Sequence, residues 1–127
     1  MAHDIRRLIE TSQENYDCIP RLVSPCGHWN AAVNRLYYAV FQLLFTDLVL
    51  SEKVDPNAPS FHDAIDSIAE EEYGRDIYNL FHNLKRLRVD VDYKGVRIGK
   101  EKFEEWKSQV DLHYKKLKER VKCVHSL

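Results

Sequence analysis

The sequence predicts an all-α protein: an up-and-down bundle of four long helices and one short helix, forming a single domain over residues 1–127. Apolar residues recur every three or four positions along most of the chain, which is helical spacing. The four glycines and four prolines lie at or near the boundaries of these periodic segments. No stretch alternates with a period of two for long enough to indicate a strand.

The first two helices are expected at residues 4–23 and 29–50. Pro20 lies inside the first segment, so the helix must either end or bend there. The second segment is apolar nearly all the way round, which indicates a central helix with neighbours on every side. Residues 24–27 make the turn between the two helices.

Three further helices are expected after a proline-containing loop. Ser60 caps the third helix with Asp63 in the capping-box position, and Gly74 ends it. The fourth helix runs to about Tyr93, and the fifth shows apolar spacing over residues 103–124. The stripe of the fourth helix has the cleanest period, at Ile77, Leu80, Phe81, Leu84, Leu87 and Val91.

Composition excludes several classes of protein. Hydrophobic residues make up 44% of the chain and charged residues 31%, which fits neither a disordered nor a membrane protein. The longest apolar run, residues 36–45, is too short for a bilayer, which needs about 20 residues. The first four residues contain no apolar region, so we expect no signal peptide. With no export signal, the three cysteines indicate reduced thiols and a cytoplasmic protein.

Standard enzyme motifs, such as a glycine-rich phosphate loop or His-Glu-x-x-His, are absent from the sequence. Four residues have side chains of the types that bind zinc: Cys18, Cys26, His28 and Cys123. Their spacing does not fit a zinc site, because Cys18 and Cys26 lack a short chelating spacing and Cys123 lies far along the chain from the other three. We therefore expect free thiols, no metal and no other cofactor.

The net charge of −1 conceals an uneven distribution. Residues 1–74 hold 5 basic and 12 acidic residues, for a net charge of −7, whereas residues 75–127 hold 14 and 8, for +6. Such a dipole either steers an acidic ligand toward one end or pairs two copies of the chain. The alternative is that helix surfaces have acquired these charges by chance.

Polar residues interrupt the apolar second helix on one face. They follow one another at spacings of three, four and four: Arg35, Tyr38, Gln42 and Thr46. Burying an arginine and a glutamine is costly unless each finds a partner. The face therefore lines a polar cleft or meets a partner helix, or Arg35 forms an ion pair with a neighbouring acid. We expect Arg35 to be buried, so that Arg35→Ala destabilises the fold by a few kcal/mol, as truncating one member of a buried pair does. A symmetric second copy would satisfy such a face, which predicts a homodimer.

A second polar group ends the fourth helix, at residues 85–93. Arg86 and Asp90 stand at i and i+4, as do Arg88 and Asp92, so weak intrahelical ion pairs are one explanation. Arginines beside an aromatic residue are also typical of phosphate and base recognition.

The two arginines of this group have different expected roles. They lie two positions apart, about 200° around the helix, so they cannot both face the core. Arg88 lies nearer the apolar stripe and should point inward and pair with Asp92. Arg86, beside Lys85 on the outer side, is then the freer phosphate contact, with Tyr93 as a stacking surface.

Together these groups resemble a known family. Residues 31–41, Ala-Ala-Val-Asn-Arg-Leu-Tyr-Tyr-Ala-Val-Phe, are similar to the Asn-Arg-Ala-Tyr-Tyr-Ala-x-Phe signature of HEPN (higher eukaryotes and prokaryotes nucleotide-binding) domains. Leu87-Arg88-x-x-x-Asp92-Tyr93 resembles that family's Leu-Arg-x-x-Ala-Asp-Tyr element. His62 follows Phe61 where members often have a Ser-His pair. The resemblance covers about residues 10–122 and implies the same helical bundle, in which Asn34, Arg35, Tyr38, Gln42 and His62 are structural or line the cleft.

Many HEPN proteins are metal-independent ribonucleases, often toxins encoded beside a minimal nucleotidyltransferase antitoxin. Their motif is an arginine followed, after four to six residues, by a histidine. This chain departs from the motif, because the corresponding positions after Arg86 and Arg88 lie within residues 91–95, Val-Asp-Tyr-Lys-Gly. The motif remnant is Arg86, Arg88, Asp92 and Tyr93, and the expected ligand contacts are Lys85, Arg86, Arg88 and Tyr93.

The resemblance therefore implies a nucleotide- or RNA-binding HEPN protein that pairs with a nucleotidyltransferase-like protein and lacks the usual ribonuclease histidine. Two alternatives stay open. One is an active metal-independent ribonuclease toxin, and the other is a dimeric scaffold or interaction module without a ligand. RNA cleavage by the purified protein separates the first alternative from the leading hypothesis.

Overall fold

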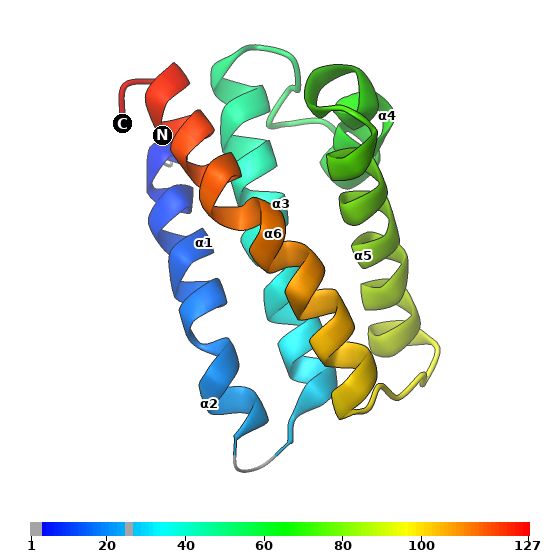
Figure 1. Ribbon diagram of the computed structural model, residues 1–127. Coiled ribbons are helices and arrows are strands. Elements are labelled where there is room, and N and C mark those ends of the chain that lie inside the picture. Colours follow the sequence, from blue (N-terminus) through cyan, green and yellow to red (C-terminus); the bar gives the residue numbers. More distant parts are fainter. Residues whose placement is uncertain (1–3, 25–26) are drawn as a thin grey trace.

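The computed structural model describes residues 4–24 and 27–127, and within these ranges the chain is helical without a strand. A 3₁₀ turn, η1 (Ile5–Arg7), leads into α1 (Leu8–Asp17) and α2 (Ile19–Val23). Then follow α3 (Trp29–Leu50), α4 (Phe61–Tyr73), α5 (Arg75–Tyr93) and α6 (Lys100–Val124). Successive long helices run in alternating directions, as an up-and-down bundle requires (Figure 1).

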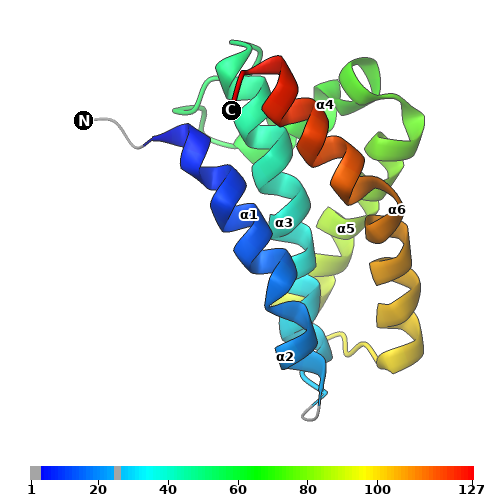
Figure 2. The same ribbon diagram turned by 60° about the vertical axis from the view of Figure 1, so that its left-hand side comes forward.

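The central position predicted for α3 is confirmed. Thirteen of its 22 residues are buried, and it packs against α1, α2, α4, α5 and α6. Figures 1 and 2 show α1 along one side of α3 and α5 along another, with α6 crossing the bundle diagonally. None of the described helices is long and apolar enough to cross a membrane.

The sequence predicts that the segment 4–23 either ends or bends at Pro20, and the structure shows an interruption just before it. The chain forms η1, α1 and α2 in succession, and α1 ends at Asp17. Pro20 lies in the first turn of α2, where its missing N–H has no intrahelical acceptor in any case. The break therefore places the proline where a helix tolerates it. The predicted turn at residues 24–27 includes Pro25 and Cys26, which lie outside the described residues.

The boundaries of α4 agree with the sequence, but its predicted capping differs. Ser60 occupies the N-cap position, yet its hydroxyl donates to the Asp63 carboxylate at 2.8 Å and accepts no backbone N–H. Gly74 separates α4 from α5 with φ +89°, in the left-handed region that favours glycine. This residue allows α5 to begin immediately after α4 ends.

The prediction that Arg35 is buried is wrong. Arg35 is exposed on α3, and its Nη1 donates to the Asn15 side-chain oxygen of α1 at 3.3 Å. The Asn15 amide in turn donates to Gln42 Oε1 at 2.8 Å, and Thr46 donates to the Gln42 carbonyl at 2.7 Å. Because Asn15 supplies the partner, this face needs neither an acidic residue nor a second copy of the chain. Tyr38 lies apart from this network and faces α4.

A buried polar cluster ties the end of the chain to the bundle. Asp47, near the end of α3, accepts hydrogen bonds from the Tyr73 hydroxyl at 2.5 Å and from His125 Nε2 at 2.6 Å. The side chains of Asp47 and His125 are 8% and 11% exposed. Desolvation by burial and the bond to Asp47 raise the pKa of Tyr73, so its hydroxyl remains a donor. One carboxylate therefore joins α3, α4 and the residue after α6.

Substitutions in this cluster and at Arg35 are expected to lower stability by different amounts. Asp47→Ala should lower the free energy of unfolding by about 2–4 kcal/mol, because it leaves two buried donors without an acceptor. Arg35→Ala should cost less than about 1 kcal/mol, because Arg35 is an exposed surface residue. Urea denaturation of both variants measures the difference. Equal losses would contradict the assignment of Asp47 as the interior polar anchor.

Candidate functional site

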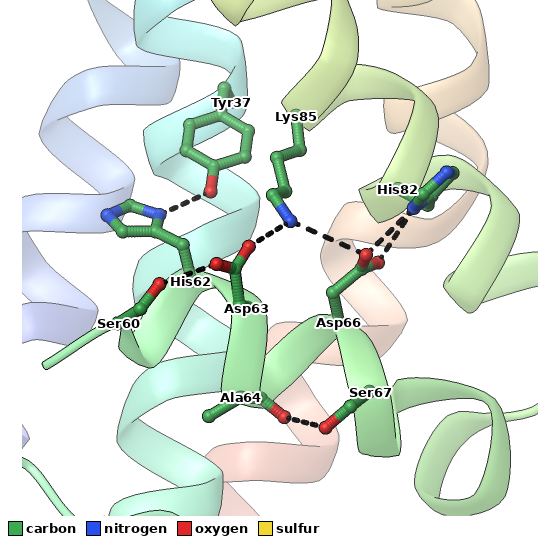
Figure 3. Close-up of polar contacts among 9 residues, drawn as sticks. All are labelled: Tyr37, Ser60, His62, Asp63, Ala64, Asp66, Ser67, His82 and Lys85. Carbon is green, nitrogen blue, oxygen red and sulfur yellow. Dashed lines mark hydrogen bonds and ion pairs between the residues drawn. The ribbon is translucent and has the colours of Figure 1, made fainter. Parts of the chain in front are cut away.

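Polar side chains line the seam between α4 and α5 and form what we call the polar ladder. It consists of His62, Asp63 and Asp66 on α4 and His82, Lys85 and Arg88 on α5. Spacings of three or four residues place each set on one face of its helix. Ion pairs and hydrogen bonds between the two sets show that both faces meet at the seam. Figure 3 shows Asp63 directed toward Lys85, Asp66 toward Lys85 and His82, and His62 toward Tyr37 of α3. The ladder ends at Arg88, where α3 supplies two tyrosines.

Arg88 occupies the α3 end of the ladder and is largely buried, with a side chain 12% exposed. Its guanidinium carbon lies 4.9 Å from the Tyr37 ring centre and 5.7 Å from that of Tyr38, a cation–π arrangement. Its Nη1 lies 3.6 Å from an Asp92 carboxylate oxygen, so the predicted inward position and pairing are confirmed. Its Nε is buried and has no hydrogen-bond partner among the described residues. The guanidinium therefore has unused donor capacity.

His62 lies beside this arginine and contacts the same tyrosine. Its Nδ1 is 2.5 Å from the Tyr37 hydroxyl, whose residue is fully buried. Desolvation raises the pKa of Tyr37, so the phenol keeps its proton and must direct it to an acceptor. Nδ1 of His62 is the acceptor that the described part of the chain provides. The neutral His62 ring then has its own proton on Nε2 and presents an N–H donor there.

Charge and burial keep His62 neutral. Burial lowers its pKa, and the positive charges of Arg88 and Lys85 lower it further. Arg88 and the His62 N–H at this end of the ladder are thus donors without a lone pair to offer. Such a set suits an anion with several acceptor oxygens, such as a phosphate.

The middle of the ladder is closed by ion pairs. Lys85 Nζ lies 2.6 Å from Asp63 and 3.5 Å from Asp66, and the lysine side chain is 20% exposed. Burial alone would lower the pKa of Lys85, but the two carboxylates outweigh it and raise that pKa. The bond from Lys85 in turn lowers the pKa of Asp63. Lys85 is therefore held in the seam, and its predicted place on the outer side beside Arg86 is wrong.

The far end of the ladder contains a histidine–aspartate pair (Figure 3). His82 Nδ1 lies 2.8 Å and 3.0 Å from the two carboxylate oxygens of Asp66. Asp66 is 16% exposed and His82 34%, so the carboxylate is shielded while the ring reaches solvent. The Tyr78 ring stacks on His82 at 5.5 Å between centres. Two contacts thus fix the orientation of this imidazole.

Two asparagines of α3 hold the end of α5 and the segment after it. Asn34 donates to Asp92 at 3.2 Å, so the carboxylate that pairs with Arg88 is itself positioned. Asn30 donates to the Val96 carbonyl at 3.3 Å and accepts from the Ile98 N–H at 3.1 Å. The connection between α5 and α6 is therefore fastened to α3 beside the Arg88 end of the ladder.

The other predicted site residues lie on different surfaces. Arg86 is exposed and Tyr93 is 74% exposed, both away from the seam. Asp90, considered as an intrahelical partner for Arg86, pairs instead with Lys94 at 3.4 Å. Val91, the first position after Arg86 where the ribonuclease motif would place its histidine, is buried. Among the cleft residues, Asn34, Tyr38 and His62 gather near Arg88, whereas Arg35 and Gln42 lie against α1.

Sequence reasoning missed Tyr37, Asp66 and His82 as members of the site. A signal for the second half of the ladder was present, because His82, Lys85 and Arg88 recur at intervals of three. Asp66 follows Asp63 at the same interval on α4. The sequence could not show which of these polar stripes faces the other.

Compared with protein-family models, curated proteins and solved structures, the chain shows no significant match. The similarity to HEPN domains thus remains a prediction from the residues on α3 and α5.

The depressed pKa of His62 gives stability a defined pH dependence. Because the folded-state pKa lies below the usual 6.5, the unfolded chain takes up a proton first as the pH falls. The stabilising contribution of His62 should therefore be complete above about pH 6.5 and decline below it. In urea denaturation between pH 7.5 and 5.5, the stability advantage of the wild type over His62→Gln should shrink as the pH falls. An advantage that grows on acidification would contradict the neutral state assigned to His62.

Proposed function

We propose that this chain binds the phosphate group of RNA or of a nucleotide at the Arg88 end of the polar ladder. The observation that supports the proposal is the largely buried guanidinium of Arg88, whose Nε has no partner in the described part of the chain and whose carboxylate partner lies at 3.6 Å. Leaving a buried donor unpaired costs about 1–3 kcal/mol, which a bound anion would recover. Arginine also matches phosphate geometry better than lysine does.

The surroundings of Arg88 favour an anion over a neutral ligand. The neutral His62 contributes an N–H donor, whereas Lys85, in the middle of the ladder, is already paired with Asp63 and Asp66. The side chain of Tyr38 is half-buried and lies beside both Arg88 and His62. We assign it the face on which a base or ribose packs. In this proposal Arg88 takes the phosphate-binding role that the sequence assigns to Arg86, because Arg86 points away from these donors.

The proposed cellular role follows the HEPN resemblance. The chain is the binding component of a cytoplasmic, toxin–antitoxin-like module, paired with a minimal nucleotidyltransferase-like protein. The family route to RNA cleavage lacks its histidine here, and the buried position 91 could not present one to a phosphate. Co-purification from the native host tests for the partner protein and a bound nucleotide.

A pair of arginine variants tests the binding site. Arg88→Lys keeps the charge but removes the planar guanidinium, so we expect affinity for a labelled single-stranded RNA to fall by about 1.5–3 kcal/mol. Arg86→Ala should lower the salt dependence of binding but have the smaller effect on affinity. Fluorescence anisotropy at two salt concentrations measures both effects, with circular dichroism as a check on folding. A larger loss in Arg86→Ala would move the site to the outer face of α5.

We also propose that the chain is a homodimer, for which the acidic first half and basic second half of the sequence provide charge complementarity. Light scattering at tens of micromolar should give twice the mass of the 15.0 kDa chain. Raising the salt concentration should weaken the association. A monomer under low-salt conditions would rule out the dimer.

A further inference from the structure

A groove lies between α5 and α6, on a different seam from the polar ladder. Its main part has a volume of about 600 Å³, and a smaller hollow of about 290 Å³ continues it, because His113 lines both. The lining of the two parts extends on α6 from Trp106 to Arg120, about 21 Å along the helix axis. The groove is therefore long enough for a chain segment rather than a single small ring.

The two walls of the groove are not joined to each other by polar contacts. α6 is fastened to α1, where the Ser12 and Tyr114 hydroxyls lie 2.8 Å apart and Lys118 Nζ donates to the Gln13 side-chain oxygen at 2.6 Å. Between α5 and α6, by contrast, the described residues exchange no hydrogen bond and no ion pair. Figure 1 shows α6 crossing the bundle diagonally rather than following α5. This seam therefore stays open, whereas the α4–α5 seam is closed by ion pairs.

Each helix contributes three lining residues at spacings of three and four, which places them on one face of the helix. They are Asp76, Asn79 and Asn83 on α5, and Trp106, Gln109 and His113 on α6. The polar side chains of both rows form no hydrogen bond with other described residues. Leu80, 7% exposed, adds apolar lining between the rows, and Leu112 is 70% exposed beside it. The groove thus combines an apolar surface with a row of available hydrogen-bonding groups on each wall.

The amide side chains have the geometry that recognises an extended peptide. A carboxamide presents an N–H donor beside a carbonyl acceptor, and a residue of an extended chain presents the same pair on one edge. Asn79 and Asn83 lie four residues apart, about 6 Å along the axis, and Gln109 and His113 have the same spacing. In an extended chain every second residue faces the same edge, a repeat of about 6.6 Å. Each wall can therefore pair with successive main-chain groups.

The smaller hollow adds a positively charged end to the groove. Lys116 and Arg120 line it together with the apolar side chains of Ile77 and Leu117. Neither cation has a carboxylate partner among the described residues. The Arg120 guanidinium is held in place by the Tyr73 ring at 4.7 Å and by the backbone carbonyl of residue 72 at 3.2 Å. This end of the groove is complementary to a carboxylate.

We propose that the α5–α6 groove binds an extended segment of a partner protein. Asn79, Asn83 and Gln109 bond to its main chain, an apolar side chain packs between Leu80 and Trp106, and an acidic residue reaches Lys116 and Arg120. Main-chain bonds supply affinity in this mode of recognition, and the side-chain contacts supply specificity. The groove is independent of the proposed phosphate site at Arg88.

Peptides selected from a random library of about ten residues, on the immobilised full chain, are the probe. The lining of the groove is long enough for about six extended residues. In fluorescence anisotropy, the double variant Asn79→Ala/Asn83→Ala should bind a selected peptide about tenfold more weakly. Asn57→Ala, in an exposed loop after α3, is the matched control and should leave affinity unchanged. Main-chain N-methylation of the peptide should weaken binding to the wild type but add little to the loss in the double variant.

The charged end is tested separately. Lys116→Gln should weaken binding about threefold, and replacing the acidic residue of the peptide with its amide should give a similar loss that does not add to it. A library without a binder would overturn the proposal, as would peptides that bind the double variant as tightly as the wild type. If Leu112→Asp halves the mass observed by light scattering, a second copy of the chain occupies the groove and the proposal is also overturned.

Discussion

The burial of most of α3 among its neighbouring helices is the constraint on which the rest of the structure depends. A helix with so many apolar residues must be surrounded, and α1, α4, α5 and α6 are placed by that requirement. The few polar groups on α3 then become fixed points, because each must find a partner within the bundle. Asp47 joins two other elements in this way, and Tyr37 bonds to His62 of α4. The packing of α3 thus determines where polar chemistry is possible.

The polar ladder lies where this apolar packing gives way to the α4–α5 seam. The low solvent exposure of the Arg88, Lys85 and Asp66 side chains strengthens their electrostatic interactions, and the cation–π contacts hold Arg88 without neutralising it. The position of each proton along the ladder follows from burial and hydrogen bonding. A buried phenol must donate, a carboxylate must accept, and the two histidines consequently adopt opposite tautomers. The seam therefore has a largely buried guanidinium at one end and an imidazole oriented by a carboxylate at the other.

Periodicity predicted the helices well, since apolar spacing directly reports burial on one face. It located α3 and the ends of α4 and α5, but at Pro20 it left open whether the helix ends or bends, which depends on local backbone geometry. It also placed Arg35 in the interior, because a sequence cannot reveal that Asn15 of α1 meets this side chain at the surface. The inward position of Arg88 was predictable from its angle to the apolar stripe. The partners His82 and Asp66 were not, because their meeting depends on how α4 packs against α5.

The most direct test of this account is the protonation of the histidine ring nitrogens, observed by NMR on ¹⁵N-labelled protein near pH 7. The account predicts that His62 has its proton on Nε2 and His82 on Nδ1, and that added single-stranded RNA shifts the His62 ring and Arg88 Nε. The same tautomer at both histidines would contradict it. So would spectra of His62 and Arg88 that RNA leaves unchanged.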